Sequence, residues 1–140
     1  MRFAEFSIKE FPRVHVKLNN RIENKEEYTH FENEWLACYR KKQNFHFIFD
    51  STEVGWIHPK YAFYVTTFIK KIKELSPQYL EFSIIIVNNS YIQHLLSWIF
   101  RVQKPVAPVY IISKNHDIHN LLKKIYEKNI IDDDVIMVNP

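Results

Sequence analysis

The sequence is poor in several residues on which common functional sites depend. Its 140 residues include one glycine, Gly55, and one cysteine, Cys38. The single cysteine excludes an internal disulfide and a zinc site built from several thiolates. The single glycine excludes the glycine-rich loops that hold phosphates and dinucleotides. No apolar run approaches the roughly 18 residues that a membrane span needs. We therefore expect a soluble, cytoplasmic protein without a nucleotide cofactor.

An excess of charge of one sign is also lacking. The 19 basic and 16 acidic residues are interspersed along the chain and give a net charge of +3. Nucleic-acid binding needs a concentrated basic face, so we expect no nucleic-acid partner. What the chain does have is apolar surface to bury. Its 46% hydrophobic and 16% aromatic content is enough for the core of one globular domain.

The strand patterns are of two kinds. Residues 45–50, 82–87 and 109–112 are continuous apolar runs, which are typical of parallel strands covered by helices on both faces. Residues 3–9 and 13–18 instead alternate polar and apolar side chains, as in an antiparallel hairpin with one solvated face. We predict a mixed, mostly parallel sheet of about five strands that begins with this hairpin.

Helical periodicity separates the strands and predicts about four helices, which cover residues 24–42, 59–75, 91–103 and 117 onward. Asn24 and Glu27 have the spacing of a capping box, Pro59 suits a first helical turn, and Asp117 suits an N-cap. Strands that alternate with helices predict right-handed crossovers and an α/β fold. We assign residues 1–128 to a single α/β domain.

Residues 129–140 are a C-terminal tail in this division. Their acidic run, residues 132–134, is most simply a solvated segment. The apolar residues 135–138 that follow are either an edge strand of the sheet or an extended segment packed on the domain. The sequence leaves both alternatives open.

A strand that ends in Asp50 and is followed by Val54 and Ile57 before a helix resembles the STAS family, the anti-sigma-factor-antagonist-like domains. The resemblance covers roughly residues 1–128 and implies the STAS fold and a non-enzymatic role in binding a protein. Members of that family have an acidic residue, a phosphorylatable serine and a glycine where this chain has His58-Pro59-Lys60-Tyr61. The phosphoserine switch of the family therefore does not carry over.

A shorter part of the chain resembles the CRAL-TRIO lipid-exchange domains. The matching segments are Leu75-Ser76-Pro77-Gln78-Tyr79-Leu80, Val87-Asn88-Asn89, Trp98-Ile99-Phe100 and Lys104-Pro105. This resemblance implies a carrier of a small lipid or another hydrophobic ligand. In such a carrier the residues expected to line a pocket are Trp56, Tyr64, Trp98 and Phe100.

The first functional hypothesis is an interaction module that binds another protein or a second copy of itself. Its candidate interaction residues are Asp50, Trp56, His58, Lys60, Phe63, Trp98 and Phe100. A helical projection places Phe63 and Thr66 opposite the stripe of the second helix that faces the sheet, and Tyr64 on that stripe. Tyr126 falls on the inward face of the last helix. The third helix is apolar over about 200°, more than a helix on a sheet needs. Either residues 135–138 or a partner would cover this excess.

Metal-binding patterns in the sequence have simpler structural interpretations. His116 and His119 are spaced as two ligands on one helix face would be, but two surface histidines explain the pattern without a metal. Asp50 and Glu53 offer two carboxylates for a cation, whereas an Asp that caps its own turn explains Asp50 equally well. We expect no metal and no other cofactor.

Candidate nucleophiles also have structural interpretations. Ser51 and Ser90 follow strands, yet neither lies in a glycine-flanked nucleophile elbow, so both are interpreted as turn or cap residues. Cys38 falls with Tyr28 and Trp35 on the inward-facing apolar stripe of the first helix and is predicted to lie in the core. An unrecognised enzyme site near Asp50 and His58 is a third and weaker hypothesis. We expect no catalytic residue.

Overall fold

Apolar strands and amphipathic helices alternate along the chain in a computed structural model that describes residues 2–140. The strands are β1 (Ala4–Glu10), β2 (Arg13–Leu18), β3 (Phe45–Asp50), β4 (Leu80–Val87), β5 (Val109–Ser113) and β6 (Ile136–Val138). The helices are α1 (Lys25–Ala37), the 3₁₀ turn η1 (Cys38–Lys41), α2 (Pro59–Lys73), α3 (Ser90–Val102) and α4 (Ile118–Tyr126). Within residues 2–140, no helix has the length and apolar character needed to cross a bilayer.

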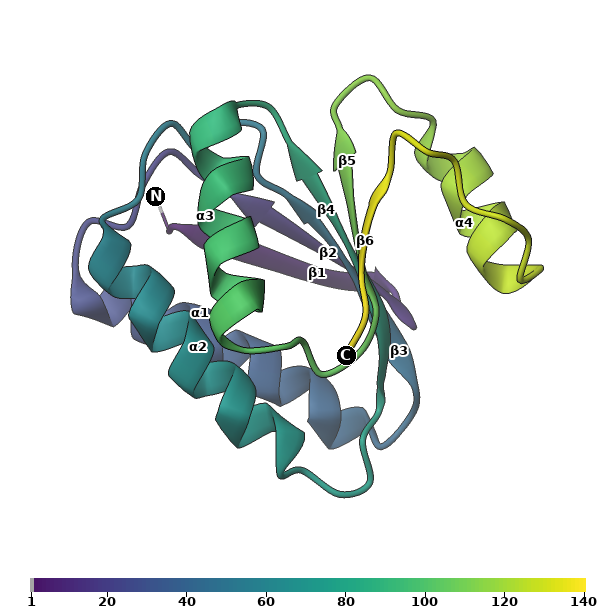
Figure 1. Ribbon diagram of the computed structural model, residues 1–140. Coiled ribbons are helices and arrows are strands. Elements are labelled where there is room, and N and C mark those ends of the chain that lie inside the picture. The colour runs from purple at the N-terminus through teal and green to yellow at the C-terminus, as the bar shows by residue number, and fades with distance from the viewer. Residues whose placement is uncertain (1) are drawn as a thin grey trace.

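The strands form one six-stranded sheet in the order β1-β2-β3-β4-β5-β6. β1 and β2 make the predicted antiparallel hairpin, and the pairs from β2 to β5 are parallel. In the centre of the sheet Phe47 pairs with Ser83, which pairs in turn with Val109. The predicted α/β class with a mixed, mostly parallel sheet is confirmed (Figure 1).

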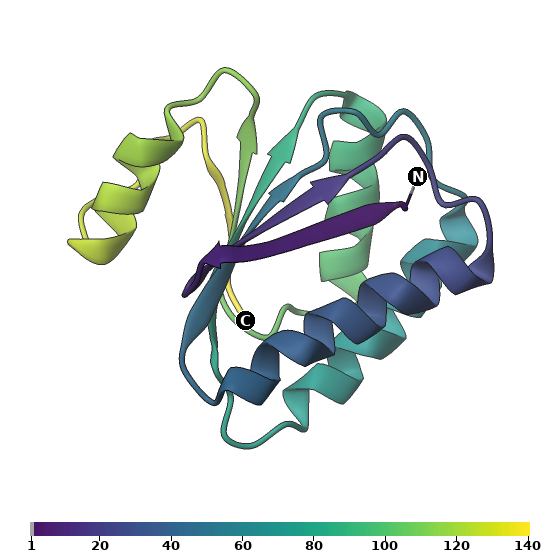
Figure 2. The same ribbon diagram turned by 180° about the vertical axis from the view of Figure 1, so that it is seen from behind.

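Helices cover both faces of the sheet, but unequally. Figure 1 and Figure 2 show α1, α2 and α3 together on one face and α4 alone on the other. Alternate residues of β3 serve the two layers: Phe47 and Phe49 belong to the core under α1–α3, and Ile48 belongs to the core under α4. This division explains the continuous apolar runs, because a strand covered on both faces needs apolar side chains at every position.

Local hydrogen bonds fix where two of the helices begin. The Asn24 carboxamide accepts a hydrogen bond from the Glu27 N–H at 2.9 Å, as predicted. The Glu27 carboxylate does not complete a capping box, because it accepts from the Phe3 N–H at 2.7 Å and so ties α1 to the start of β1. At the start of α2, His58 Nδ1 accepts from the Lys60 N–H at 3.1 Å.

Two residues of α2 and one of α4 lie differently from the helical projection. Thr66 is buried instead of exposed, because its hydroxyl donates to the Phe63 carbonyl oxygen at 2.7 Å and needs no water. Tyr64 and Tyr126, both predicted to face inward, are exposed. Each ends in a hydroxyl, and Tyr126 places its hydroxyl 3.2 Å from His46 Nδ1.

The C-terminal segment is an edge strand. β6 pairs antiparallel with β5, with Ile136 opposite Ile111 and Val138 opposite Val109. Val138 packs against the core under α1–α3, whereas Val135 belongs to the core under α4. The alternative that the sequence left open is thereby decided, since the backbone hydrogen bonds of β5 are shared with β6.

Candidate functional site

A cavity of about 150 Å³ lies between the sheet and helices α1, α2 and α3. Phe31 of α1, Ile69 of α2 and Leu96 of α3 contribute to its walls. Phe49 of β3 and Ile85 of β4 contribute to its floor on the sheet. Its lining is almost wholly apolar, so the space is suited to an apolar molecule and not to an ion.

Small side chains explain why the space is left open. Ser51, Ala62, Ser83 and Ala107 are all buried and all line the cavity. Most of the other lining residues are large aromatic or aliphatic side chains, so space remains where these four short side chains stand. Protein interiors are normally close-packed, so a cavity of this size is an uncommon feature of the fold.

Two polar groups belong to residues of this apolar lining. Tyr28 and Trp35 lie on the same face of α1, and each packs against Phe31 with ring centroids 6.0 and 5.8 Å apart. The Tyr28 hydroxyl and the Trp35 indole nitrogen are buried, and neither forms a hydrogen bond of acceptable geometry among residues 2–140. The Trp35 N–H lies close enough to the Tyr39 hydroxyl to influence its pKa without forming such a bond. Buried polar groups are nearly always paired, so both groups could form a hydrogen bond with a ligand.

The protonation of these two groups decides what they offer. Burial, assisted by the Glu32 carboxylate one turn further along α1, raises the pKa of Tyr28, so the hydroxyl keeps its proton at neutral pH. Glu32 is close enough to act on this pKa, but its carboxylate does not form a hydrogen bond of acceptable geometry with the hydroxyl. An indole N–H can only donate. Both groups therefore suit a ligand that carries a hydrogen-bond acceptor.

Ser51 and Cys38 are not activated as nucleophiles. The Ser51 hydroxyl donates to the Ile86 carbonyl oxygen at 2.6 Å and links the ends of β3 and β4. Cys38 is buried as predicted, and burial, with a smaller contribution from Glu34, raises the pKa of its thiol to about 11. A thiol with a raised pKa is a poor nucleophile at neutral pH.

The turn after β3 is held by its own polar groups. The Asp50 carboxylate accepts from the Thr52 N–H at 3.0 Å and from the Thr52 hydroxyl at 2.6 Å. Burial opposes ionisation, but these hydrogen bonds and the Lys17 ammonium together hold the pKa of Asp50 below its usual value. Lys17 also forms an ion pair with Glu53. The carboxylates predicted as possible cation ligands therefore already share a lysine.

Three more of the predicted interaction residues are exposed around the start of α2. Trp56 is 52% exposed, and its ring lies 5.7 Å from that of His58. His58 caps the helix through Nδ1, and the Lys60 ammonium lies 5.3 Å from the Tyr61 ring centroid. These side chains are accessible, but the structure does not bring them into a constellation with catalytic geometry.

The remaining predicted residues divide between surface and interior. Phe63 is 58% exposed, as the projection predicted, and its ring meets that of Trp98 edge to face with centroids 4.9 Å apart. Phe100 is only 8% exposed and lines the cavity, so it is not available as a surface anchor. Of the four residues predicted to line a pocket, Phe100 does so, whereas Trp56, Tyr64 and Trp98 lie outside the cavity lining.

The cavity was not predicted from the sequence, because the apolar stripe of α1 was interpreted only as core. Tyr28 and Trp35 were predicted to face inward, but the need of their hydroxyl and indole N–H for hydrogen-bond partners was not considered. Buried Tyr and Trp side chains usually place the O–H or N–H on a partner. The sequence places two such residues on one buried stripe and predicts no polar residue opposite them. This pattern could have indicated a binding site.

The comparisons with known proteins do not assign a family. No protein-family model matches the sequence. No curated protein matches it either. The resemblance to STAS and CRAL-TRIO domains therefore rests on the residues quoted above, and function has to be argued from the geometry.

Proposed function

We propose that this protein is a non-enzymatic binding module that holds a small, mostly apolar ligand in the cavity under α1–α3. One observation carries the proposal: an apolar cavity lined by Tyr28 and Trp35, whose buried hydroxyl and indole N–H have no hydrogen-bond partner among residues 2–140. A small rotation of either side chain would turn its donor toward the cavity. An apolar body would fill the space, and an acceptor atom would pair with one of the two donors. The Ser51 hydroxyl is already hydrogen-bonded to a backbone carbonyl, and the Cys38 thiol has a raised pKa. Both observations support binding over catalysis.

The cavity volume limits the size of the ligand. A dry apolar cavity of about 150 Å³ accommodates benzene. The cavity here has a volume of about 150 Å³, so a one-ring compound or a short aliphatic compound fits without moving a helix. A long-chain lipid would require α2 or α3 to move away from the sheet. The geometry therefore favours a compact hydrophobic ligand over the acyl lipids of the CRAL-TRIO resemblance.

The donors limit the chemistry of the ligand. Tyr28 and Trp35 both offer a proton, so the ligand needs a carbonyl, ether or hydroxyl oxygen to receive it. A carboxylate is disfavoured, because burying an anion in an apolar space costs several kcal/mol unless a cation pairs with it. We infer a neutral ligand with one oxygen acceptor. A compound of about ten non-hydrogen atoms would bind in the range of about 1–100 µM.

Two probes of equal size test the proposal. Acetophenone has a carbonyl acceptor, and cumene is an equally large hydrocarbon without one. Both should bind the cavity, with acetophenone tighter by about two- to tenfold, the usual value of one hydrogen bond. Titration followed by ¹H–¹⁵N NMR would show it, because acetophenone should shift the Trp35 indole N–H resonance. Failure of both probes to bind at millimolar concentration would contradict the proposal.

Matched variants locate the bound probe. Tyr28→Phe and Trp35→Phe should each keep cumene binding, and the variant that removes the paired donor should lose the acetophenone preference. Ser83→Leu, which fills the cavity, should abolish binding of both probes. Phe63→Ala, outside the lining, should change neither. Undiminished binding by a folded Ser83→Leu protein would place the ligand elsewhere.

We propose, as a second candidate function, self-association through the exposed Phe63 side chain and the Trp98 ring against which it packs. The observation that favours it is an aromatic pair on the outer surface of α2 and α3, with Trp56 exposed on the loop that leads into α2. Symmetric homodimers are the commonest oligomers, and aromatic side chains are typical anchors of interfaces.

Light scattering coupled to size-exclusion chromatography tests this second function. We expect the wild-type protein to show a concentration-dependent dimer. Phe63→Ala should weaken the dimer about 30-fold or more, corresponding to about 2 kcal/mol for an aromatic anchor. Lys71→Ala, an exposed change on the same helix, is the control. A wild-type protein that remains monomeric at millimolar concentration would exclude self-association.

A further inference from the structure

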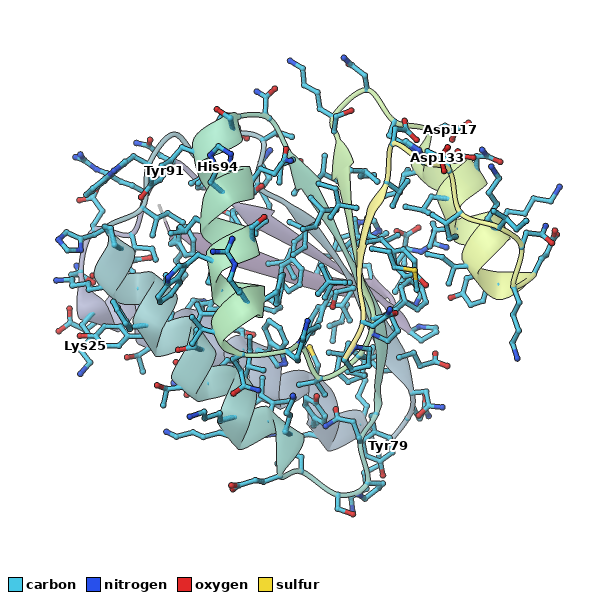
Figure 3. The ribbon with its side chains drawn as sticks, viewed as in Figure 1. Lys25, Tyr79, Tyr91, His94, Asp117 and Asp133 are labelled. Atoms are coloured by element: carbon cyan, nitrogen blue, oxygen red, sulfur yellow. The ribbon has the colours of Figure 1, made fainter. Side chains whose placement is uncertain are left out.

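We propose that His116, Asp132 and Asp134 form a binding site for a divalent transition-metal ion of the Zn²⁺ class. The site lies at the turn between β5 and α4, where the segment leading into β6 passes. It is separate from the cavity, which lies under the helices on the other face of the sheet (Figure 3, in which Asp117 and Asp133 label this end of the molecule). A metal bound there would hold the C-terminal strand β6 in place.

The geometry of the three side chains supports the site. His116 Nε2 lies 3.7 Å from Asp132 Oδ2 and 3.5 Å from Asp134 Oδ1. All three ligand atoms lie within 4.8 Å of one another. Ligand atoms around a tetrahedral Zn²⁺ are about 3.4 Å apart, given metal–ligand distances near 2.1 Å. The two nitrogen–oxygen distances are thus already close to those of a filled site, and the exposed Asp134 side chain can close the third.

The state of His116 is the independent observation that points to a ligand. Its side chain is only 6% exposed, in contrast to the surface position expected from the sequence. Its Nδ1 is buried and has no hydrogen-bond partner in the described part of the chain. Its Nε2 points at two carboxylates from distances longer than an ordinary N–H···O hydrogen bond. A cation bound by Nε2 and the two carboxylates would replace these long contacts with metal–ligand bonds, whereas Nδ1, on the other side of the ring, would not contact it.

The donor set indicates the class of metal. One imidazole nitrogen and two carboxylate oxygens suit Zn²⁺, Co²⁺ or Mn²⁺, with water completing the coordination. Ca²⁺ and Mg²⁺ prefer oxygen ligands only, so they should bind much more weakly. The site also contains a competitor, because the Lys124 ammonium forms an ion pair with the other oxygen of Asp132. Asp132 nevertheless keeps Oδ2 for a metal.

The position of the ligands gives the site a structural role. His116 lies between β5 and α4, whereas Asp132 and Asp134 lie between α4 and β6. A shared metal would close this stretch of chain into a loop and hold the short strand β6 against β5. β6 is an edge strand of three residues, so an added constraint should change its stability more than that of the central strands.

Isothermal titration of the full chain with Zn²⁺, and visible spectroscopy with Co²⁺, test the proposal. We expect one Zn²⁺ per chain and Co²⁺ absorption bands of a four- or five-coordinate site. At a 100-fold excess of free Zn²⁺ over Kd, the Tm should rise by about 5–10 °C. In hydrogen exchange, the β6 residues should gain protection. Binding by His116→Gln, Asp132→Asn and Asp134→Asn should weaken at least tenfold.

Neighbouring residues supply the controls. His119→Gln, in the first turn of α4, and Asp133→Asn, between the two aspartates, leave the three ligands unchanged, and both variants should bind Zn²⁺ like the wild type. Lys124→Gln should tighten binding severalfold, because it removes the competing ammonium. The proposal is overturned if the wild type binds no Zn²⁺ below 100 µM, or if the His119→Gln protein loses as much affinity as His116→Gln. The cluster would then be an ordinary surface contact between a histidine and two carboxylates.

Discussion

The two faces of the sheet are built from the same strands and yet differ in packing. Under α1–α3 the layer is thick, rich in aromatic side chains, and encloses a cavity. Under α4 the layer is smaller and is confined to the part of the sheet around β3–β5. Beyond it, the hairpin of β1 and β2 presents polar side chains such as Lys9 and His15 to the solvent.

This difference teaches what a strand pattern reports. In β2 only one face is covered, so the sequence alternates between buried Val14 and Val16 and partly exposed polar residues. In β3 both faces are covered, so the alternation disappears. A continuous apolar run therefore indicates that both faces of a strand are covered, but it does not indicate how well the side chains on each face are packed.

The largest expected effect compares the two layers directly at adjacent residues of β4. Ile84 is fully buried under α4, and Ile85 borders the cavity on the opposite face. Ile84→Ala should lower the free energy of unfolding by about 3–5 kcal/mol, and Ile85→Ala by about 2–3 kcal/mol, because Ile85 already lacks packing partners on its cavity side. Urea unfolding measures both.

Lys71→Ala, on the exposed face of α2, serves as the control for this pair. It should change stability by less than about 0.5 kcal/mol. If Ile85→Ala proves costlier than Ile84→Ala, the layer under α1–α3 is the better packed of the two and the cavity is filled in solution.

The second effect uses a buried histidine on the α4 side of the sheet. His46 stacks on Phe82 with ring centroids 4.5 Å apart. Burial, with repulsion from Arg13 and His15, lowers the pKa of His46 to about 4. The unfolded chain takes up this proton near pH 6.5, so the stabilisation is complete above that pH. It is lost as the pH falls toward 4, by at most about 3 kcal/mol.

Urea unfolding between pH 4 and 8 measures this loss. The stability of the wild type should fall below pH 6.5, and that of His46→Asn should fall less steeply over the same interval. The other groups that face His46 are the Arg13 guanidinium and the Tyr126 hydroxyl, which stay in place in the variant. Equal slopes for the two proteins would mean that other groups cause the acid sensitivity.

The third effect concerns the free energy of unfolding when the cavity under α1–α3 is partly filled. Ser83→Val adds apolar volume at a buried position between Phe47 and Val109 in the sheet. Filling a cavity commonly stabilises a protein by about 0.5–2 kcal/mol, so we expect an increase of about 1 kcal/mol. Thr67→Val on the exposed face of α2 is the control and should give no increase. A destabilised Ser83→Val protein would indicate that the Ser83 hydroxyl has an essential partner.

The smallest effect concerns the charged end of the sheet, which both layers share. Lys17 pairs with Asp50 and Glu53, but all three side chains are partly exposed. Lys17→Met should lower the free energy of unfolding by less than about 1 kcal/mol at low ionic strength, and the difference should vanish in 0.5 M NaCl. Unfolding curves at the two salt concentrations test this. A loss that persists in salt would show that packing of the lysine stem matters.

Much of the fold could be predicted because the deciding signals are local. The apolar run at residues 45–50, the alternation in residues 13–18, and Asp117 as the cap of α4 are each readable within a few residues. The helix faces were less accurate, as Thr66 shows. Its burial depends on a hydrogen bond to the Phe63 carbonyl, which the projection does not contain.

The candidate sites could not be predicted from the sequence, because each site joins residues that are distant along the chain. His116 was judged together with His119, its neighbour in sequence, whereas the structure places it against Asp132 and Asp134. Phe100 was expected either at an interaction surface or in the lining of a ligand pocket, and the structure places it in the lining of the cavity. Proximity between residues of different elements follows from the crossovers and from helix packing, and neither leaves a local pattern.

The sequence by itself determined the layers of this protein. Apolar periodicity and the cap residues decide which segments become strands or helices and which faces must be covered, because burial of apolar surface is the main driving force of folding. Only the tertiary structure decided where packing is incomplete. Three features result from how the helices pack on the sheet. They are the position of Ser83 between Phe47 and Val109, the lack of a partner for the Tyr28 hydroxyl among residues 2–140, and the burial of the His116 ring. The packing of helices on a sheet depends on the shapes of many side chains at once, so no short stretch of sequence encodes it.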